Sequence, residues 1–72
     1  MDMKYVILNP INELIIFSPS KQHSDFRHQN VKSAGFIKFH NDKAHCYGNS
    51  ISLNIKSDIE DSNIANKQIY GV

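Results

Sequence analysis

The stretch KYVIL (residues 4–8), NPIN (9–12) and ELIIF (13–17) decides the fold that we expect for this chain. The first and last runs are rich in residues that favour strands, and the Asn and Pro between them favour a turn and disfavour helix. The stretch therefore predicts a β-hairpin. Both runs are apolar on successive residues, which is typical of strands buried on both faces of a sheet. We expect a helix on one face and a helix or a partner on the other.

A second pair of strands is predicted in the centre of the chain. Residues 31–39 (VKSAGFIKF) read as a strand, and the small residues Ser33, Ala34 and Gly35 allow a bulge or the close approach of another backbone. Residues 40–43 (HNDK) form the turn after this strand.

The chain then returns as a partner strand over residues 44–47, followed by a turn at Gly48 and Asn49. Beyond this turn, apolar and polar side chains alternate with a period of two, a pattern that predicts a half-buried strand. The alternating run consists of Ser50, Ile51, Ser52, Leu53, Asn54 and Ile55.

A helix is predicted at the C-terminal end by the capping-box sequence SDIE at residues 57–60. The Ser57 hydroxyl would accept from the Glu60 amide, and the Glu60 side chain would reach back to the Ser57 amide. Gly71 suits the left-handed conformation that commonly ends a helix. A helical wheel groups four residues on a broad face, namely Ile59, Ala65, Ile69 and Tyr70. Ile64 falls outside that face and is our candidate interface residue, with a frayed helix end as the alternative.

The segment between the two pairs of strands is ambiguous. Ser18 followed by Pro19 has the form of a helix N-cap and a proline at the first helical position. However, residues 20–30 contain one large apolar side chain, Phe26, so a helix there would bury little surface. Residues 19–30 therefore read either as a short helix or as an ordered loop.

These elements predict the α+β class, with a small, mostly antiparallel sheet made of the N-terminal hairpin and the central strands, and a capped C-terminal helix. The 72 residues, of 8.2 kDa, correspond to a single small domain over residues 1–72. A chain this short buries a modest fraction of its surface, so a homodimer is one expected source of extra stability.

The charge and cysteine content limit the environment and the partners. Eight basic and seven acidic residues leave a formal charge of +1, which gives no long-range field for nucleic acid or anionic lipid. The single cysteine, Cys46, allows no internal disulfide and suits a reducing compartment. The apolar run near the start is too short for a signal peptide or a membrane span. We therefore expect a cytoplasmic protein that does not bind membranes.

The residues that carry catalytic or metal chemistry are poorly arranged. His45 and Cys46 are neighbours in a strand, so their side chains point to opposite faces, and Cys46 reads best as a small buried thiol. Residues 23–25 (HSD) come without an oxyanion-hole motif. The five-residue spacing within the pairs His23/His28 and His40/His45 is unlike that of structural zinc sites. We therefore expect no enzyme activity, no cofactor and no metal.

Residues 32–39 (KSAGFIKF) partly resemble RNP1, the base-stacking strand of RNA-recognition motifs. That resemblance implies RNA or single-stranded DNA binding through Lys32, Phe36, Lys38 and Phe39. Ser33 and Ala34 replace a glycine and a stacking aromatic of the motif, which removes one platform for a base. The alternative is a core strand that contains two phenylalanines.

Three segments together resemble small uncharacterised proteins encoded in bacterial prophages. The shared outline is SAGF, then CxGxSxSL, then SxxED, found here at residues 33–36, 46–53 and 57–61. The resemblance implies a phage-type origin and supplies no site residues. The sequence thus favours a small non-enzymatic module that binds an unidentified host protein, as an inhibitor or modulator. The alternatives are nucleic-acid binding through residues 32–39 and a structural homo-oligomer.

Overall fold

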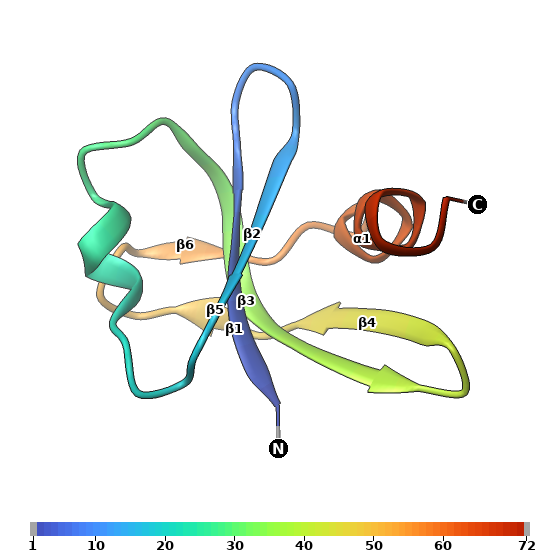
Figure 1. Cartoon of the computed structure of the whole chain (residues 1–72). Coiled ribbons are helices and arrows are strands. Elements are labelled where there is room, and N and C mark those ends of the chain that lie inside the picture. Colours follow the sequence, from blue (N-terminus) through green and yellow to red (C-terminus); the bar gives the residue numbers. More distant parts are fainter. Residues whose placement is uncertain (1, 72) are drawn as a thin grey trace.

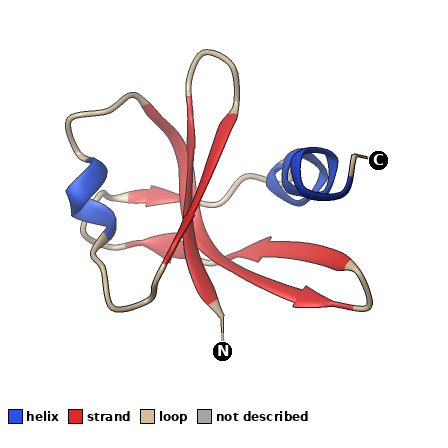
Figure 2. Cartoon of the chain, viewed as in Figure 1, coloured by secondary structure: helices blue, strands red, loops and turns tan. Residues whose placement is uncertain are grey.

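The computed structural model describes residues 2–71, and its strands and helices are arranged as an α+β fold, as the sequence predicts (Figures 1 and 2). The elements, in chain order, are β1 (Met3–Leu8), β2 (Glu13–Phe17), the 3₁₀ helix η1 (His23–Phe26), β3 (Val31–His40), β4 (Lys43–Tyr47), β5 (Asn49–Ser50), β6 (Ile55–Lys56) and α1 (Asp61–Tyr70). The main sheet is four-stranded, in the order β2-β1-β3-β4, and every neighbouring pair in it is antiparallel.

Both predicted pairs of strands are present. The N-terminal stretch forms the hairpin β1–β2, and residues 31–47 form the hairpin β3–β4. The second hairpin closes through Asn41 and Asp42, whose φ angles of 50° and 59° are those of a two-residue hairpin turn. Asn and Asp tolerate this left-handed region better than other residues with side chains.

Strand β1 is buried on both faces, as its continuous apolar run predicts. On one face, Tyr5 and Ile7 pack with Ile37, Ala44 and Ala65, the last of these from α1. On the other face, Val6 and Leu8 belong to a second cluster with Phe17 and Ala34. Side chains from η1 and from the β5–β6 region cover this second cluster, namely Phe26, Leu53 and Ile55.

Helix α1 lies in the angle between the β1–β2 hairpin and the β3–β4 hairpin (Figure 1). Its buried residues are Asp61 and Ala65, and Ile64 is half-buried against the first cluster. Of the predicted apolar face only Ala65 is buried, because Ile69 and Tyr70 are each 39% exposed. Ile59 lies before the helix and is 92% exposed, whereas Ile64 faces the core. The wheel failed because the inward stripe begins with the acidic residue Asp61, which carries no hydrophobic signal.

The predicted capping box at Ser57 is also wrong, because the helix begins four residues later. The Ser57 amide donates to the Gly48 carbonyl, outside the helix. A reciprocal pair one residue further on precedes α1: the Asp58 side chain accepts from the Glu60 amide at 3.0 Å, and Asp61 accepts from the Asp58 amide at 2.9 Å. At the other end, Gly71 adopts the expected left-handed conformation, with φ of 73°.

The predicted strand over residues 50–55 is replaced by a small hairpin. Only Asn49–Ser50 and Ile55–Lys56 are paired, and the residues between them form a turn. The Ser50 hydroxyl accepts from the Leu53 amide at 3.2 Å, so a serine that seemed to belong to an alternating strand stabilises a turn instead. Ile51, at the turn, is 89% exposed.

The ambiguous segment after β2 does not form the helix that Ser18 and Pro19 suggested. The Ser18 hydroxyl accepts from the Ser20 amide at 3.2 Å and stabilises a local turn. A single 3₁₀ turn follows at His23–Phe26, and its two buried or half-buried ends, His23 and Phe26, pack on the sheet.

The small residues in β3 allow a close backbone approach, as predicted. A Cβ atom at Gly35 would overlap the carbonyl oxygen of Tyr47. The bulge between β1 and β3 lies elsewhere: Ile7 pairs with Ser33 and Leu8 with Val31, which leaves Lys32 as the extra residue.

Candidate functional site

The only fully buried carboxylate among the described residues, that of Asp61, is held at the centre of the fold. It accepts hydrogen bonds from the Tyr5 hydroxyl at 2.5 Å, the Ser33 hydroxyl at 2.8 Å and the Asp58 amide. Burial, and then the hydrogen bond to Asp61, raises the pKa of Tyr5. Three donors satisfy this carboxylate and it lies away from solvent, so its role is to join α1 to β1 and β3.

Cys46 is half-buried against the same core, as predicted for a small buried thiol. Burial, and then the negative charge of Asp61, raises the pKa of the Cys46 thiol to about 11. The neighbouring side chain of His45 is exposed on the opposite face of β4, so these two side chains do not meet. The prediction from strand geometry is confirmed.

The four histidines lie in different surroundings. His23 is buried, its Nε2 lies 2.8 Å from the Gly35 carbonyl oxygen, and its ring packs edge-on against Phe17 and Phe36. His28, His40 and His45 are exposed. Within residues 2–71 there is no group of three or more His, Cys, Asp or Glu side chains that could hold a metal ion.

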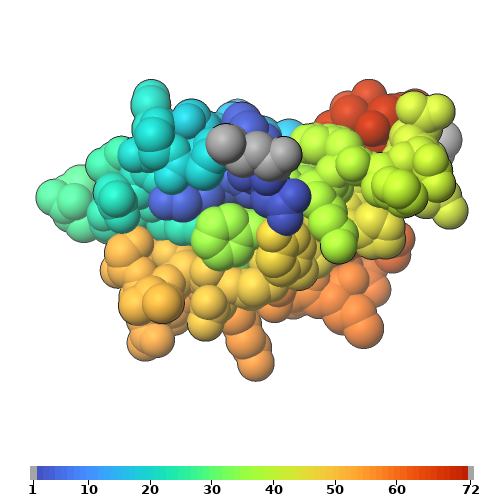
Figure 3. Space-filling model, turned by 90° about the horizontal axis from the view of Figure 1, so that it is seen from below, coloured from blue at the N-terminus to red at the C-terminus, as the bar shows by residue number. Residues whose placement is uncertain are grey.

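The main exposed site lies on the side of β3 and β4 that faces away from α1, beyond the part covered by η1 and the β5–β6 hairpin. Cross-strand partners share a face of a sheet, and the register brings together residues from three strands. We call this surface the β3–β4 face, and it consists of Lys4, Phe36, Lys38, His40, His45 and Tyr47. Figure 3 looks onto this side, where the blue N-terminal strand meets green β3 and yellow β4.

Two aromatic rings form the centre of the β3–β4 face. The ring centroids of Phe36 and Tyr47 are 5.9 Å apart, with 31° between the ring planes. The Lys38 ammonium lies 5.7 Å from the Tyr47 ring centroid. The Tyr47 hydroxyl donates to the Asp2 carboxylate, and this hydrogen bond raises the pKa of Tyr47. Tyr47 nevertheless remains 40% exposed, so its ring is both oriented and accessible.

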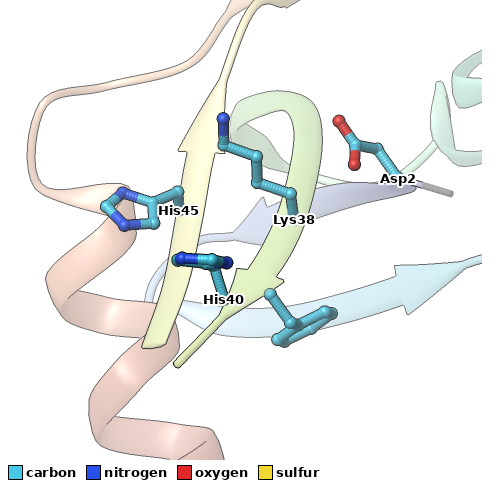
Figure 4. A pocket seen from close by; sticks show the side chains of 5 residues that line it. Asp2, Lys38, His40 and His45 are labelled. Atoms are coloured by element: carbon cyan, nitrogen blue, oxygen red, sulfur yellow. The ribbon is translucent and has the colours of Figure 1, made fainter. Parts of the chain in front are cut away.

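A shallow hollow of about 440 Å³ is lined by Lys38, whose ammonium lies near the Tyr47 ring (Figure 4). Lys38, His40 and His45 lie around it, with Asp2 beyond Lys38. Lysine and imidazole nitrogens thus outnumber the one carboxylate here, although the whole chain is close to neutral. The hollow is open and suits contact with a surface or a flexible chain rather than enclosure of a small molecule.

The structure separates the four residues that the RNP1 resemblance indicated. Phe36 and Lys38 lie on the β3–β4 face. Phe39 is three positions from Phe36, so its side chain leaves β3 on the opposite side, which faces α1. Its partner across the hairpin is buried Ala44, and Phe39 also lines the rim of the hollow. Lys32 lies at the other end of β3, where its ammonium contacts the Asn12 side chain at 3.2 Å.

Tyr47 is the functional candidate that the sequence reasoning missed. It comes from β4 and sits directly opposite Phe36, whereas the RNP1 pattern places its second aromatic within β3 itself, at position 34. The two-residue turn at Asn41 and Asp42 fixes the hairpin register, so counting outward from that turn would have paired Tyr47 with Phe36.

A larger groove of about 720 Å³ lies between β4 and α1. Its wall includes Ser62 and Asn66, whose polar atoms already bond to the β4 backbone. On the β3–β4 face, only the Tyr47 hydroxyl and the Lys4 ammonium are hydrogen-bonded to other described residues, whereas Lys38, His40 and His45 project around the hollow, so this face is the stronger candidate.

Comparison with known proteins finds no matching family model, no similar curated protein and no similar solved structure. The phage-type outline therefore stays a prediction from the sequence. No helix within residues 2–71 has the length and apolar character needed to cross a membrane.

Proposed function

We propose that this protein is a non-enzymatic binding module that holds a partner protein on its β3–β4 face. The observation that carries the proposal is the aromatic pair of exposed Tyr47 and half-buried Phe36, which lies where η1 and the β5–β6 hairpin leave the sheet face open. Tyrosine is enriched at the centres of protein interfaces, where a rigid ring with a polar tip contributes much binding energy.

A binding role without catalysis is supported by the positions of the reactive groups. Asp61 is enclosed by three donors, and the raised pKa of Cys46 keeps that thiol protonated near neutral pH. His23 is hydrogen-bonded within the core. These groups stabilise the fold and do not converge on an open pocket with a nucleophile and a base.

The charge of the face indicates the chemistry of the partner. Lys38 and the exposed His40 and His45 surround the hollow beside Asp2, and Lys4 lies on the same face. We infer that the partner presents an acidic surface with an apolar or aromatic side chain that packs on Tyr47. The resemblance to prophage proteins supports a host protein in the bacterial cytoplasm as the source of that surface.

Single-stranded nucleic acid is a second candidate for the same face. Tyr47 beside Phe36 supplies the second stacking aromatic that β3 alone lacks, and Lys38 lies close enough to contact a phosphate. Nucleic-acid binding through Phe36, Tyr47 and Lys38 does not require the contacts that the sequence predicted for Lys32 and Phe39. The near-neutral charge of the chain makes this candidate the weaker of the two.

The decisive experiment places a photo-crosslinking phenylalanine analogue at position 47, in the cells that naturally express the protein. A matched probe at position 59 replaces Ile59, which is 92% exposed and lies outside the β3–β4 face. We expect one protein to crosslink at position 47 and not at position 59. Equal crosslinking at both positions, or none at position 47, would contradict the proposal.

The crosslinked protein is then purified and its affinity is measured by calorimetry. We expect Lys38→Glu to weaken binding roughly tenfold, since it reverses a charge at the centre of the interface. Lys67→Glu, on the exposed side of α1, is the control with the same charge change and should bind as the unaltered chain does. If oligonucleotides bind instead, with an affinity that falls steeply with salt and is lost in Lys38→Glu, the second candidate is correct.

A further inference from the structure

The outer edge of β4 is hydrogen-bonded by side chains of α1. Asn66 accepts from the Ala44 amide at 2.8 Å and donates to the Ala44 carbonyl at 2.9 Å, as a neighbouring strand would. The Ser62 hydroxyl accepts from the Cys46 amide at 2.9 Å. We call this the covered edge, because its outward amides are already paired.

The outer edge of β2 is covered only at its start. The Gln68 side chain accepts from the Leu14 amide at 3.2 Å and donates to the Asn12 carbonyl. Backbone direction alternates along a strand, so Ile16 points outward like Leu14. Within residues 2–71, no hydrogen bond joins the Ile16 amide or carbonyl to another segment. We call this the open edge.

The open edge is apolar on both sides of the sheet. Leu14 and Ile16 lie on the α1 side, Ile15 lies on the other side, and all three side chains are half-buried. An apolar edge with free amides and carbonyls is a template for another strand. The occupant it requires is therefore a strand with exposed backbone groups and apolar side chains.

We propose that the occupant is a second copy of this chain, whose β2 pairs antiparallel with β2 of the first and joins the two sheets into one. With Ile16 opposite Ile16 of the second copy, each amide can donate to the other's carbonyl. The outward amide of Ser18 then reaches the Leu14 carbonyl of the second copy. In this register the Ser18 carbonyl of the second copy comes opposite the Leu14 amide, so it replaces the Gln68 side chain as the acceptor of that amide.

The charges along the edge select the antiparallel direction. Glu13 lies at one end of β2, and Lys21 lies beyond the other end, where its carbonyl accepts from the Lys4 ammonium of β1 at 2.7 Å. Antiparallel pairing brings Glu13 of each copy towards Lys21 of the other. Parallel pairing would bring like charges together. The edge is thus complementary to itself, which favours a second copy over an unrelated strand.

The proposal goes beyond the partner-binding function, because the open edge is on β2, whereas the aromatic pair of the β3–β4 face comes from β3 and β4. Its test is the dissociation constant of self-association, measured by analytical ultracentrifugation of the full chain. Glu13→Lys and Lys21→Glu, both at exposed positions, should each weaken self-association roughly tenfold, since each places two like-charged pairs across the dimer. Mixing the two variants should restore the affinity, because both pairs then carry opposite charges.

The controls carry the same charge changes away from the open edge, as Glu60→Lys and Lys56→Glu. These variants, alone or mixed, should associate as the unaltered chain does. A chain that remains monomeric at every soluble concentration would overturn the proposal. Association that ignores the two charge reversals, or a mixture that recovers no affinity, would overturn it as well.

Discussion

The two edge strands of the sheet differ in what lies beyond them. The covered edge of β4 has its outward amides bonded to Ser62 and Asn66, so β4 is hydrogen-bonded on both sides although β4 is an edge strand of the sheet that residues 2–71 form. The open edge of β2 has a single covered amide, that of Leu14. A short helix can therefore hydrogen-bond the outer edge of a strand as a neighbouring strand would. Helix α1 does this for β4, the strand that carries Tyr47.

This arrangement separates a fixed surface from an adaptable one. Tyr47 and His45 are held in place because β4 is paired with β3 on one side and with α1 on the other. The β2 strand keeps free backbone groups and can accept a further strand. The two proposed interactions therefore use different physics: side-chain contacts on the β3–β4 face, and main-chain hydrogen bonds at the open edge.

The largest expected effect comes from the residue that fixes α1 against the sheet. Asp61→Ala removes the acceptor of Tyr5, Ser33 and the Asp58 amide, and leaves the two buried hydroxyls without a partner. We expect the free energy of unfolding to fall by roughly 3–5 kcal/mol. Chemical denaturation measures this loss, and the weakened helix should also uncover the β4 edge.

Two further variants serve as controls for the stability loss of Asp61→Ala. Asp61→Asn keeps the size of the side chain and one acceptor oxygen, so it should lose less stability than Asp61→Ala and remain folded. Glu60→Ala, on the exposed residue just before the helix, should change stability by less than about 0.5 kcal/mol. A loss for Asp61→Ala no greater than that for Glu60→Ala would show that the buried carboxylate does not hold the helix.

A smaller effect is expected from uncovering the β4 edge directly. Asn66→Ala leaves the amide and the carbonyl of Ala44 without partners, at a cost of roughly 1–3 kcal/mol. Asn63→Ala is the matched control, because Asn63 lies on the same helix, is exposed and donates from its side chain to Glu60 at 3.4 Å, away from β4. Denaturation and hydrogen exchange should show a loss of stability and faster exchange of the Ala44 amide in the first variant alone.

The same two variants, Asn66→Ala and Asn63→Ala, can also be compared by their self-association. If the covered edge prevents pairing, Asn66→Ala should associate more strongly than the unaltered chain, and Asn63→Ala should not. Equal association of both variants would mean that Asn66 does not protect the edge.

The sequence predicts the strands better than it predicts the contacts between α1 and the sheet. The two hairpins follow from β-rich runs and from the turn residues at 9–12 and 40–43, since these signals are local. Asn66, Gln68 and Asp61 act on strands at least 22 residues away in the chain, as the 22-residue separation of Asn66 from Ala44 illustrates. Polar residues on a helix read as a solvated face, and only the tertiary arrangement reveals their partners.

The candidate site was predictable in part for a related reason. Phe36 and Lys38 are two positions apart in β3 and therefore share a face, so the pattern in one strand was enough to place them together. Phe39 was included because a motif was read as a string of residues rather than as two faces of a strand. Tyr47 required the register between strands, which the turn at residues 41–42 determines.

The last prediction concerns the reactivity of Cys46, which reports whether the covered edge stays closed. Thiolates react with iodoacetamide and thiols do not. Because the pKa of Cys46 is raised from 9.0 to about 11, the folded protein at pH 8 should react roughly a hundredfold more slowly than the unfolded chain. The reaction rate should rise with pH until about 11. The protonated thiol contributes its full stability below pH 9, and this contribution should be lost as the pH rises from 9 to about 11.

The same measurement distinguishes the two helix variants. Asn66→Ala should react faster than Asn63→Ala at pH 8, since an uncovered edge gives water access to the thiol. A rate that levels off near pH 9 in the unaltered protein would mean that Cys46 is solvated, and that the β4 edge opens far more often than its hydrogen bonds to α1 imply.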